Sequence, residues 1–145
     1  MNYLENIKVL EAKRNKILEI RDSCAGEVKE DISDLHLFEN RLSGSYAKII
    51  EYILKIMDEK NQLGYELKTY RNSLVESSGL FSDLEEPDWL YKDKTYREKK
   101  EIFDRYCSLF DLALSCRSYI ESRGYQLDRI RKIYEVRRKF SDPHD

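Results

Sequence analysis

The sequence predicts an all-α fold, an elongated antiparallel bundle of three long helices with coiled-coil-like packing. Two observations predict it. The 145 residues include only two Pro and five Gly, and residues 1–86 and 88–142 contain no Pro, the strongest helix breaker. Within these stretches apolar residues recur every three or four positions, the period of a helix packed against other helices. A chain of this length fits a single domain, residues 1–145.

Composition excludes several classes of protein. With 41% apolar and 12% aromatic residues the chain is too hydrophobic to be disordered, and with 37% charged residues it is too polar to span a membrane. A net charge of −2 does not favour nucleic-acid binding. The spacing of Cys24, Cys107 and Cys116 fits no zinc or redox motif. We therefore expect a cytoplasmic protein with reduced cysteines, with peripheral attachment to a membrane as an open alternative.

We expect the first helix over about residues 3–42. Its apolar stripe consists of Ile7, Leu10, Ile17, Cys24, Val28, Leu35, Phe38 and Leu42. The segment Ser43-Gly44-Ser45 follows, in which Gly can end one helix and Ser can cap the next. The same segment is also compatible with a kink in one longer helix. The sequence leaves both interpretations open.

The second helix is expected over about residues 45–76, followed by an acidic loop over about residues 77–93. The helix has an apolar stripe formed by Tyr46, Ile49, Ile53, Ile56, Leu63, Leu67, Tyr70 and Leu74. The loop is predicted from the Ser, Gly, Asp and Pro residues within 77–88. Trp89 lies at its end. It is either an anchor for a partner or lipid headgroups, or a hydrophobic staple that closes the loop on the bundle, and the second interpretation is favoured.

The third helix is expected over about residues 94–140. Its stripe has an unbroken 3-4-3-4 spacing through Tyr106, Leu109, Ala113, Cys116, Ile120, Arg123, Leu127, Ile130, Tyr134 and Arg137. Other apolar residues lie off this stripe. We expect Phe103, Phe110 and Tyr119 to form an exposed row that, with Arg123, contacts the partner in a homo- or heterodimer.

Two arginines, Arg123 and Arg137, lie within the apolar stripe of the third helix. Each side chain either bends so that its guanidinium reaches water, or supplies an interface charge paired with a carboxylate such as Asp31. The sequence does not choose between these interpretations.

Basic residues gather near the end of the third helix. Residues 129–139 hold six basic groups and one acidic group. The basic residues are Arg129, Arg131, Lys132, Arg137, Arg138 and Lys139. They are candidate contacts for anionic lipid, although such a cluster is more often simply solvated.

No arrangement typical of an enzyme occurs in the sequence. The two His residues accompany no metal-binding, phosphate-binding or nucleophile motif. We therefore expect a non-enzymatic protein with no catalytic residue, no metal site and no cofactor.

The third helix resembles the last helix of sorting-nexin-type BAR domains at Tyr106, Arg123, Leu127 and Tyr134. Leu42-Ser43-Gly44-Ser45-Tyr46 is similar to the small-residue kink in that family's first helical region. The resemblance implies an antiparallel dimer with a curved surface that binds and shapes phosphoinositide-containing endosomal membranes. The alternative is a coiled-coil adaptor or structural subunit without lipid binding, including a helical secretion partner. WXG-type secretion partners place a Trp between two helices, but Tyr91 stands where their motif has Gly. We expect no nucleic-acid partner.

Overall fold

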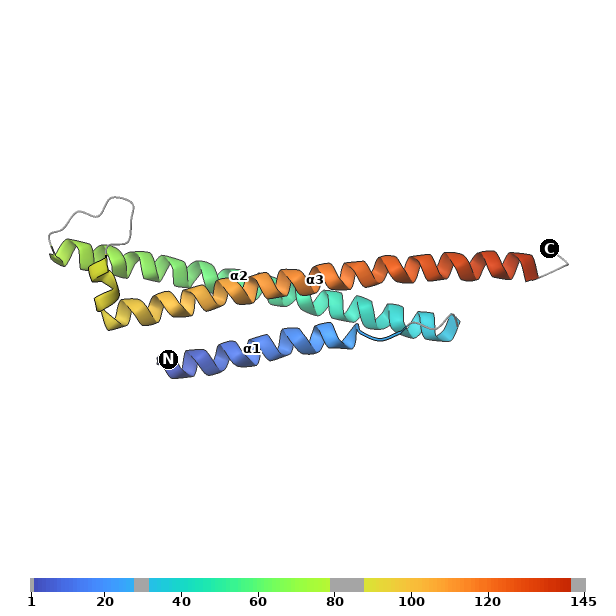
Figure 1. Cartoon of the computed structure of the whole chain (residues 1–145), viewed down its shortest axis with the longest axis horizontal. Helices are drawn as coiled ribbons and strands as arrows, with labels where there is room; N and C mark the ends of the chain where they lie inside the picture. The colour runs from blue at the N-terminus through green and yellow to red at the C-terminus, as the bar shows by residue number, and fades with distance from the viewer. Residues whose placement is uncertain (1, 28–31, 79–87, 142–145) are drawn as a thin grey trace. The chain divides into compact units, whose positions relative to one another are not determined.

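The computed structural model describes residues 2–27, 32–78 and 88–141. Three α-helices and one short 3-10 helix follow one another in these ranges: α1 (Tyr3–Ser23), α2 (Ile32–Ser78), η1 (Asp88–Lys92) and α3 (Lys94–Ser141) (Figure 1). No β-strand occurs in them. The prediction of an all-α helical bundle is confirmed.

The first helix is shorter than predicted. It ends at Ser23, and the prediction that it runs to residue 42 is wrong. The chain leaves the helix through two tight turns, in which the Cys24 and Ala25 amides bond to carbonyl oxygens three residues earlier at 3.0 and 3.1 Å. Gly26 follows with a φ of 109°, a left-handed conformation that costs other residues energy. The end of the first helix, which the sequence placed before Ser43-Gly44-Ser45, therefore lies close to Gly26.

The segment Ser43-Gly44-Ser45 lies inside α2, so the placement of a helix start at residue 45 is wrong, and of the two interpretations the structure agrees with one longer helix that runs through the segment. Ser45 is buried, and its Oγ lies 2.9 Å from the Oγ of Ser23 at the end of α1. A small side chain is needed here because α1 and α2 approach closely. Packing, rather than termination of a helix, thus accounts for the buried serine.

The boundaries on either side of the loop agree with the sequence. α2 ends at Ser78, two residues beyond the predicted position, and α3 begins at Lys94 as expected. Asp93 caps α3, because its Oδ1 accepts a hydrogen bond from the Tyr96 amide at 2.8 Å and another from the Tyr70 hydroxyl at 3.0 Å. Within the predicted loop, residues 79–87 lie outside the described residues.

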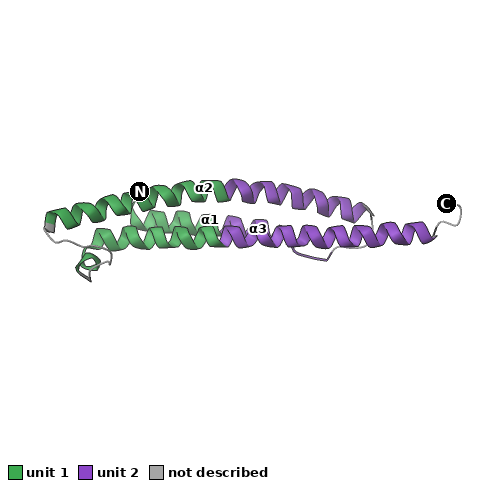
Figure 2. Cartoon of the chain, turned by 90° about the horizontal axis from the view of Figure 1, so that it is seen from above, with its two compact units in different colours: residues 1–14, 53–111 green, residues 15–52, 112–145 purple. Residues whose placement is uncertain are grey.

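Two compact units divide the chain, and each contains part of all three α-helices (Figure 2). Unit 1 comprises residues 1–14 and 53–111, and unit 2 comprises residues 15–52 and 112–145. The expectation of a single domain stays a prediction.

In unit 1, η1 closes the core at the end of the α2–α3 pair. Leu67, Leu90 and Tyr96 form a buried cluster, and Leu90 and Tyr96 are completely inaccessible to solvent. The start of α1 is fixed to α3 by a hydrogen bond from the Tyr3 hydroxyl to Glu101. Lys13, further along α1, forms an ion pair with Glu59 of α2.

In unit 2, α1 runs parallel to α3, because Ile17 contacts Cys116 and the later Cys24 contacts the later Arg123. α2 runs antiparallel to α3. Glu39 of α2 pairs with Arg131 of α3, whereas Tyr46, further along α2, donates to the earlier Glu121 at 3.4 Å. The predicted stripe of α3 is buried here as far as Leu127, apart from the half-buried Arg123, whereas Ile130 and Tyr134 are only half-buried and Arg137 is exposed. Its buried members in this unit are Ala113, Cys116, Ile120 and Leu127.

Candidate functional site

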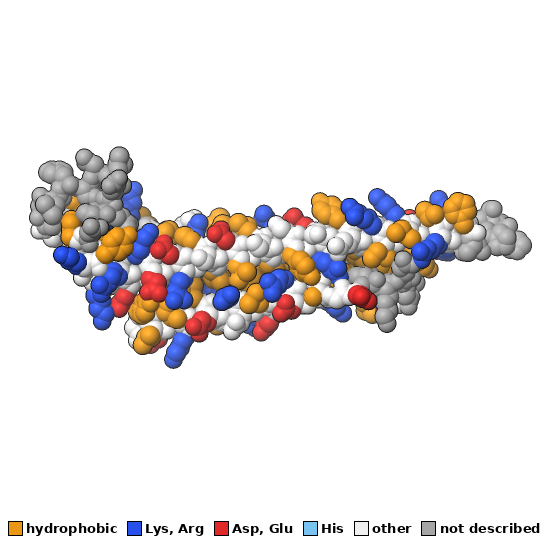
Figure 3. All heavy atoms as spheres, viewed as in Figure 1, with side chains coloured by type: hydrophobic (Ala, Val, Ile, Leu, Met, Phe, Trp, Pro, Cys, Tyr) orange, Lys and Arg blue, Asp and Glu red, His pale blue; other side chains and the backbone are white. Residues whose placement is uncertain are grey.

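The last three turns of α3 expose apolar side chains to solvent. Ile133 is 45% exposed, Val136 52% and Phe140 88%. Spacings of three and four residues place these side chains on one face of the helix. Figure 3 shows hydrophobic and basic side chains together over this end of α3. The exposed apolar residues therefore form a strip within unit 2 rather than scattered single positions.

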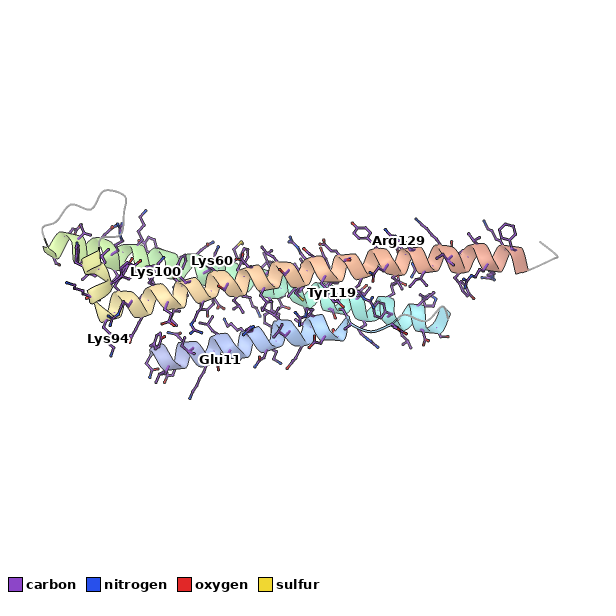
Figure 4. All side chains as sticks on the ribbon, in the orientation of Figure 1. Glu11, Lys60, Lys94, Lys100, Tyr119 and Arg129 are labelled. Carbon is purple, nitrogen blue, oxygen red and sulfur yellow. The ribbon has the colours of Figure 1, made fainter. Side chains whose placement is uncertain are left out.

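Basic side chains flank the apolar strip. Arg129, which Figure 4 labels on α3, is exposed, and so are Lys132 and Lys139. Arg137 and Arg138 are exposed as well. The last three turns of α3 thus combine a strong local positive charge with apolar surface, although the whole chain carries a net charge of −2. Five of the six predicted lipid contacts are exposed on this segment.

The sixth predicted lipid contact is engaged within the chain. Arg131 forms an ion pair with Glu39 of α2, and its side chain is only 35% exposed. The same Glu39 carboxylate lies 3.9 Å from His36. Arg131 therefore contributes to the α2–α3 contact, and its charge is less available to an external partner.

Arg123, predicted as part of a dimer interface, is bound inside unit 2. Its Nε donates to the carbonyl oxygen of Cys24 at 3.0 Å, and a second guanidinium nitrogen donates to the carbonyl of Gly26. The guanidinium also lies over the Phe38 ring at 5.0 Å. Arg123 thus binds two carbonyl groups of the segment that directly follows α1, a role that the pattern of the sequence did not indicate. The proposed partner Asp31 lies outside the described residues.

The row expected to be exposed along α3 is half-buried. Phe103 packs against the buried cluster of unit 1, and Lys60 lies 4.7 Å above the Phe110 ring. Tyr119 is also of intermediate exposure. The expectation that these three residues are exposed is wrong, because α2 and its side chains lie against the first two. Whether a second copy contacts them stays a prediction.

Trp89 lies in η1 and packs against the cluster of Leu67, Leu90 and Tyr96. This contact agrees with the interpretation of Trp89 as a staple at the end of the bundle. The side chain is of intermediate exposure. Its indole is therefore largely committed to the core of unit 1.

An acidic groove of about 290 Å³ lies between α2 and α3 in unit 2. Its three carboxylates are Glu39, Glu121 and Asp128. The remaining lining residues are Leu42, Ser43, Gly124, Tyr125 and Leu127. The sequence contains one signal for this groove, Gly124, which has no side chain to fill the space beside α2. The period of apolar residues does not distinguish Gly124 from other small residues of α3.

Within residues 2–27, 32–78 and 88–141, no group of three or more His, Cys, Asp or Glu residues is arranged to hold a metal ion. None of the described helices combines the length and hydrophobicity needed to cross a membrane.

The chain was compared with protein families, curated proteins and solved structures. No protein-family model matches the chain, and no match was found among the curated proteins or the solved structures.

Proposed function

We propose that this chain is a non-enzymatic helical module that binds anionic membrane surfaces through the last three turns of α3. The observation that carries the proposal is the joint exposure of Ile133, Val136 and Phe140 beside basic side chains. Basic amphipathic helices lie in the membrane interface with apolar residues inserted and basic residues at the headgroups. The α2 and α1 segments of unit 2 leave this face of α3 uncovered.

The energetics favour reversible binding. A basic residue near an anionic bilayer contributes about 1 kcal/mol, and apolar surface removed from water contributes about 25 cal/mol per Å². The attraction falls off within a Debye length of about 8 Å at physiological salt. Acidic groups elsewhere on the chain therefore weaken binding little, provided that they lie further than this from the bilayer.

The proposal agrees with the resemblance to sorting-nexin-type BAR domains, whose members bind endosomal membranes. Dimerisation, a curved surface and a preference for phosphoinositides remain predictions of that resemblance. The mode of attachment proposed for α3 does not require them. It requires only anionic lipid on the membrane leaflet that the protein meets.

A second candidate function is a coiled-coil adaptor or structural subunit that binds protein. One observation favours it: in unit 1, α2 exposes Leu54 (54%) and Tyr65 (72%). The surrounding charges are of both signs, with Lys55 and Asp58 next to this face. An apolar face surrounded by charges of both signs suits a partner helix better than an anionic bilayer.

Vesicle co-sedimentation tests the proposal. We expect the protein to bind phosphatidylserine vesicles at 50 mM salt, to bind them several-fold less at 300 mM salt, and not to bind phosphatidylcholine vesicles. Replacing Lys132 and Lys139 together by Glu should abolish binding. Replacing Ile133 and Val136 together by Ser should weaken it at least several-fold.

The matched control is Lys16→Glu with Lys48→Glu, which makes the same charge change at two exposed positions on α1 and α2. It should retain most of the binding, because these residues lie outside the proposed surface. Binding that is equal for both double charge reversals would contradict the proposal. Absence of binding to anionic vesicles at low salt would leave the adaptor function as the better candidate.

A further inference from the structure

Six exposed residues form one stripe along α3 in unit 2, which we call the α3 stripe. It consists of Glu121, Tyr125, Asp128, Lys132, Val136 and Lys139, all of them exposed. The successive spacings of 4, 3, 4, 4 and 3 residues keep them on one face of the helix. Along the chain the stripe is acidic, apolar, acidic and then basic, apolar, basic.

This order makes the α3 stripe complementary to itself when it is reversed. If two copies of α3 lie antiparallel about a twofold axis near residue 130, Asp128 of each copy faces Lys132 of the other. Glu121 then faces Lys139, and Tyr125 lies beside Val136. A parallel arrangement in register would instead place like charges opposite each other. Isologous contacts of this kind are typical of symmetric dimers.

The acidic groove adjoins the α3 stripe and leaves room for side chains of a second helix. Glu121, Tyr125 and Asp128 of the α3 stripe also line the groove, together with Ser43 of α2. A Cβ added at Gly124 would meet no atom within 4 Å. Within the described residues, Glu121 has long contacts to the Tyr46 hydroxyl at 3.4 Å and Arg117 at 3.8 Å, and its side chain is 46% exposed. Its carboxylate therefore remains accessible to a Lys side chain from outside.

We propose that two copies of this chain pair antiparallel through the α3 stripe, and that this pairing covers part of the surface proposed to bind membranes. The second half of this statement rests on the proposed function, because Lys132, Val136 and Lys139 belong to both surfaces. Pairing and membrane binding then exclude each other. A second copy is the occupant that the charges favour, since each acidic group of the stripe meets a basic group of the same stripe.

The pairing is expected to be weak. The stripe spans 19 residues of helix, about 28 Å at 1.5 Å per residue, and it offers one apolar contact on each side of the axis. Such a contact is smaller than the roughly 1,600 Å² of a standard interface. We therefore expect a dissociation constant of tens to hundreds of micromolar in low salt, rising with ionic strength.

Charge exchange between two variants tests the pairing without lipid. Sedimentation equilibrium at 50 mM salt and up to about 1 mM protein should show dimers of the wild type. Asp128→Lys alone and Lys132→Asp alone should each sediment as monomers, because like charges then face each other at both symmetric positions. An equimolar mixture of the two variants should dimerise again, and so should the double variant. Far-ultraviolet circular dichroism checks that each variant remains helical.

Several results would overturn the pairing. The wild type would stay monomeric at 1 mM, or the single variants would dimerise like the wild type. A mixture of the two single variants that stays monomeric would also contradict it. Asp58→Lys, a charge reversal at an exposed position of α2, is the matched control and should leave dimerisation unchanged. If Asp58→Lys failed to dimerise, the total charge of the chain, and not the α3 stripe, would control association.

A separate measurement tests whether pairing covers the surface of α3 that is proposed to bind membranes. Two batches that carry a donor or an acceptor dye on a cysteine introduced by Ser122→Cys, with Cys107→Ser, should show energy transfer when mixed, because position 122 is exposed close to the pairing surface. Anionic vesicles at low surface density should abolish the transfer, and neutral vesicles should leave it unchanged. Transfer that persists on vesicles to which the protein is bound overturns mutual exclusion. A protein that dimerises but binds no vesicle contradicts the proposed function alone, and a monomer that binds vesicles contradicts the pairing alone.

Discussion

Arg123 of α3 donates a hydrogen bond from its Nε to the carbonyl oxygen of Cys24, with a separation of 3.0 Å. Cys24 directly follows the last residue of α1, where carbonyl groups have no partner within the helix. The guanidinium also covers the Phe38 ring of α2 at 5.0 Å. The Arg123 side chain of α3 thus contacts both the segment that follows α1 and a side chain of α2.

Replacing Arg123 should destabilise the fold. Arg123→Met keeps much of the aliphatic volume but removes the charged donors, and we expect the free energy of unfolding to fall by about 1.5–3 kcal/mol. Arg129→Met, at an exposed position two turns later, is the control and should change it by no more than about 0.5 kcal/mol. Urea unfolding followed by circular dichroism gives both values. Equal effects would show that Arg123 does not hold the end of α1.

Two glycines distinguish the real helix break from the apparent one. Gly26→Ala should destabilise the protein by about 1 kcal/mol, because Ala does not readily adopt a φ of 109°. Gly44→Ala should stabilise it by up to about 1 kcal/mol, because Gly44 lies inside α2 and faces open space. Thermal unfolding of the two variants should shift the midpoint in opposite directions. Shifts of the reverse signs would place the break at residue 44.

Loss of the cap of α3 should also be measurable. Asp93→Ala removes the acceptor of the Tyr96 amide and of the Tyr70 hydroxyl, and we expect a cost of about 1–2 kcal/mol in urea unfolding. Asp104→Ala removes only a surface ion pair with Lys100 and should cost about 0.5 kcal/mol or less. An Asp93→Ala variant as stable as Asp104→Ala would contradict the role of Asp93 as a cap.

The three cysteines should react at different rates. Cys116 is 1% exposed, and burial raises the pKa of its thiol to about 11, so almost no thiolate is present at pH 8. Cys24 is fully buried, whereas Cys107 is of intermediate exposure. Iodoacetamide at pH 8 followed by peptide mass spectrometry should therefore modify Cys107 first. Equal modification of Cys116 in the folded protein would contradict its burial.

The apolar period of the sequence was sufficient to predict most of the core. It identified Leu109, Ala113 and Ile120 as buried, because a stripe that repeats every three and four residues must face other helices. The loop-forming Ser, Gly, Asp and Pro residues within 77–88 located the start of α3 at residue 94. These features depend on local spacing, which a single sequence records directly.

The sequence did not determine where the first helix ends. Gly26 and Gly44 are both flanked by small or polar residues, and only the contact between Ser23 and Ser45 shows that the second site is a packing position. The role of Arg123 depends likewise on a carbonyl 99 residues earlier in the chain. Periodicity does not encode such contacts between distant segments, and it does not say which apolar faces remain uncovered.

Hydrogen–deuterium exchange measures directly whether the end of α3 meets an anionic membrane, as we propose. Backbone amides of residues 129–140 should exchange at least several-fold more slowly when phosphatidylserine vesicles are added. Exchange in residues 44–60 of α2 should not change, and phosphatidylcholine vesicles should have no effect on either segment. Unchanged exchange at residues 129–140 with bound anionic vesicles, or slowing confined to α2, would contradict the account.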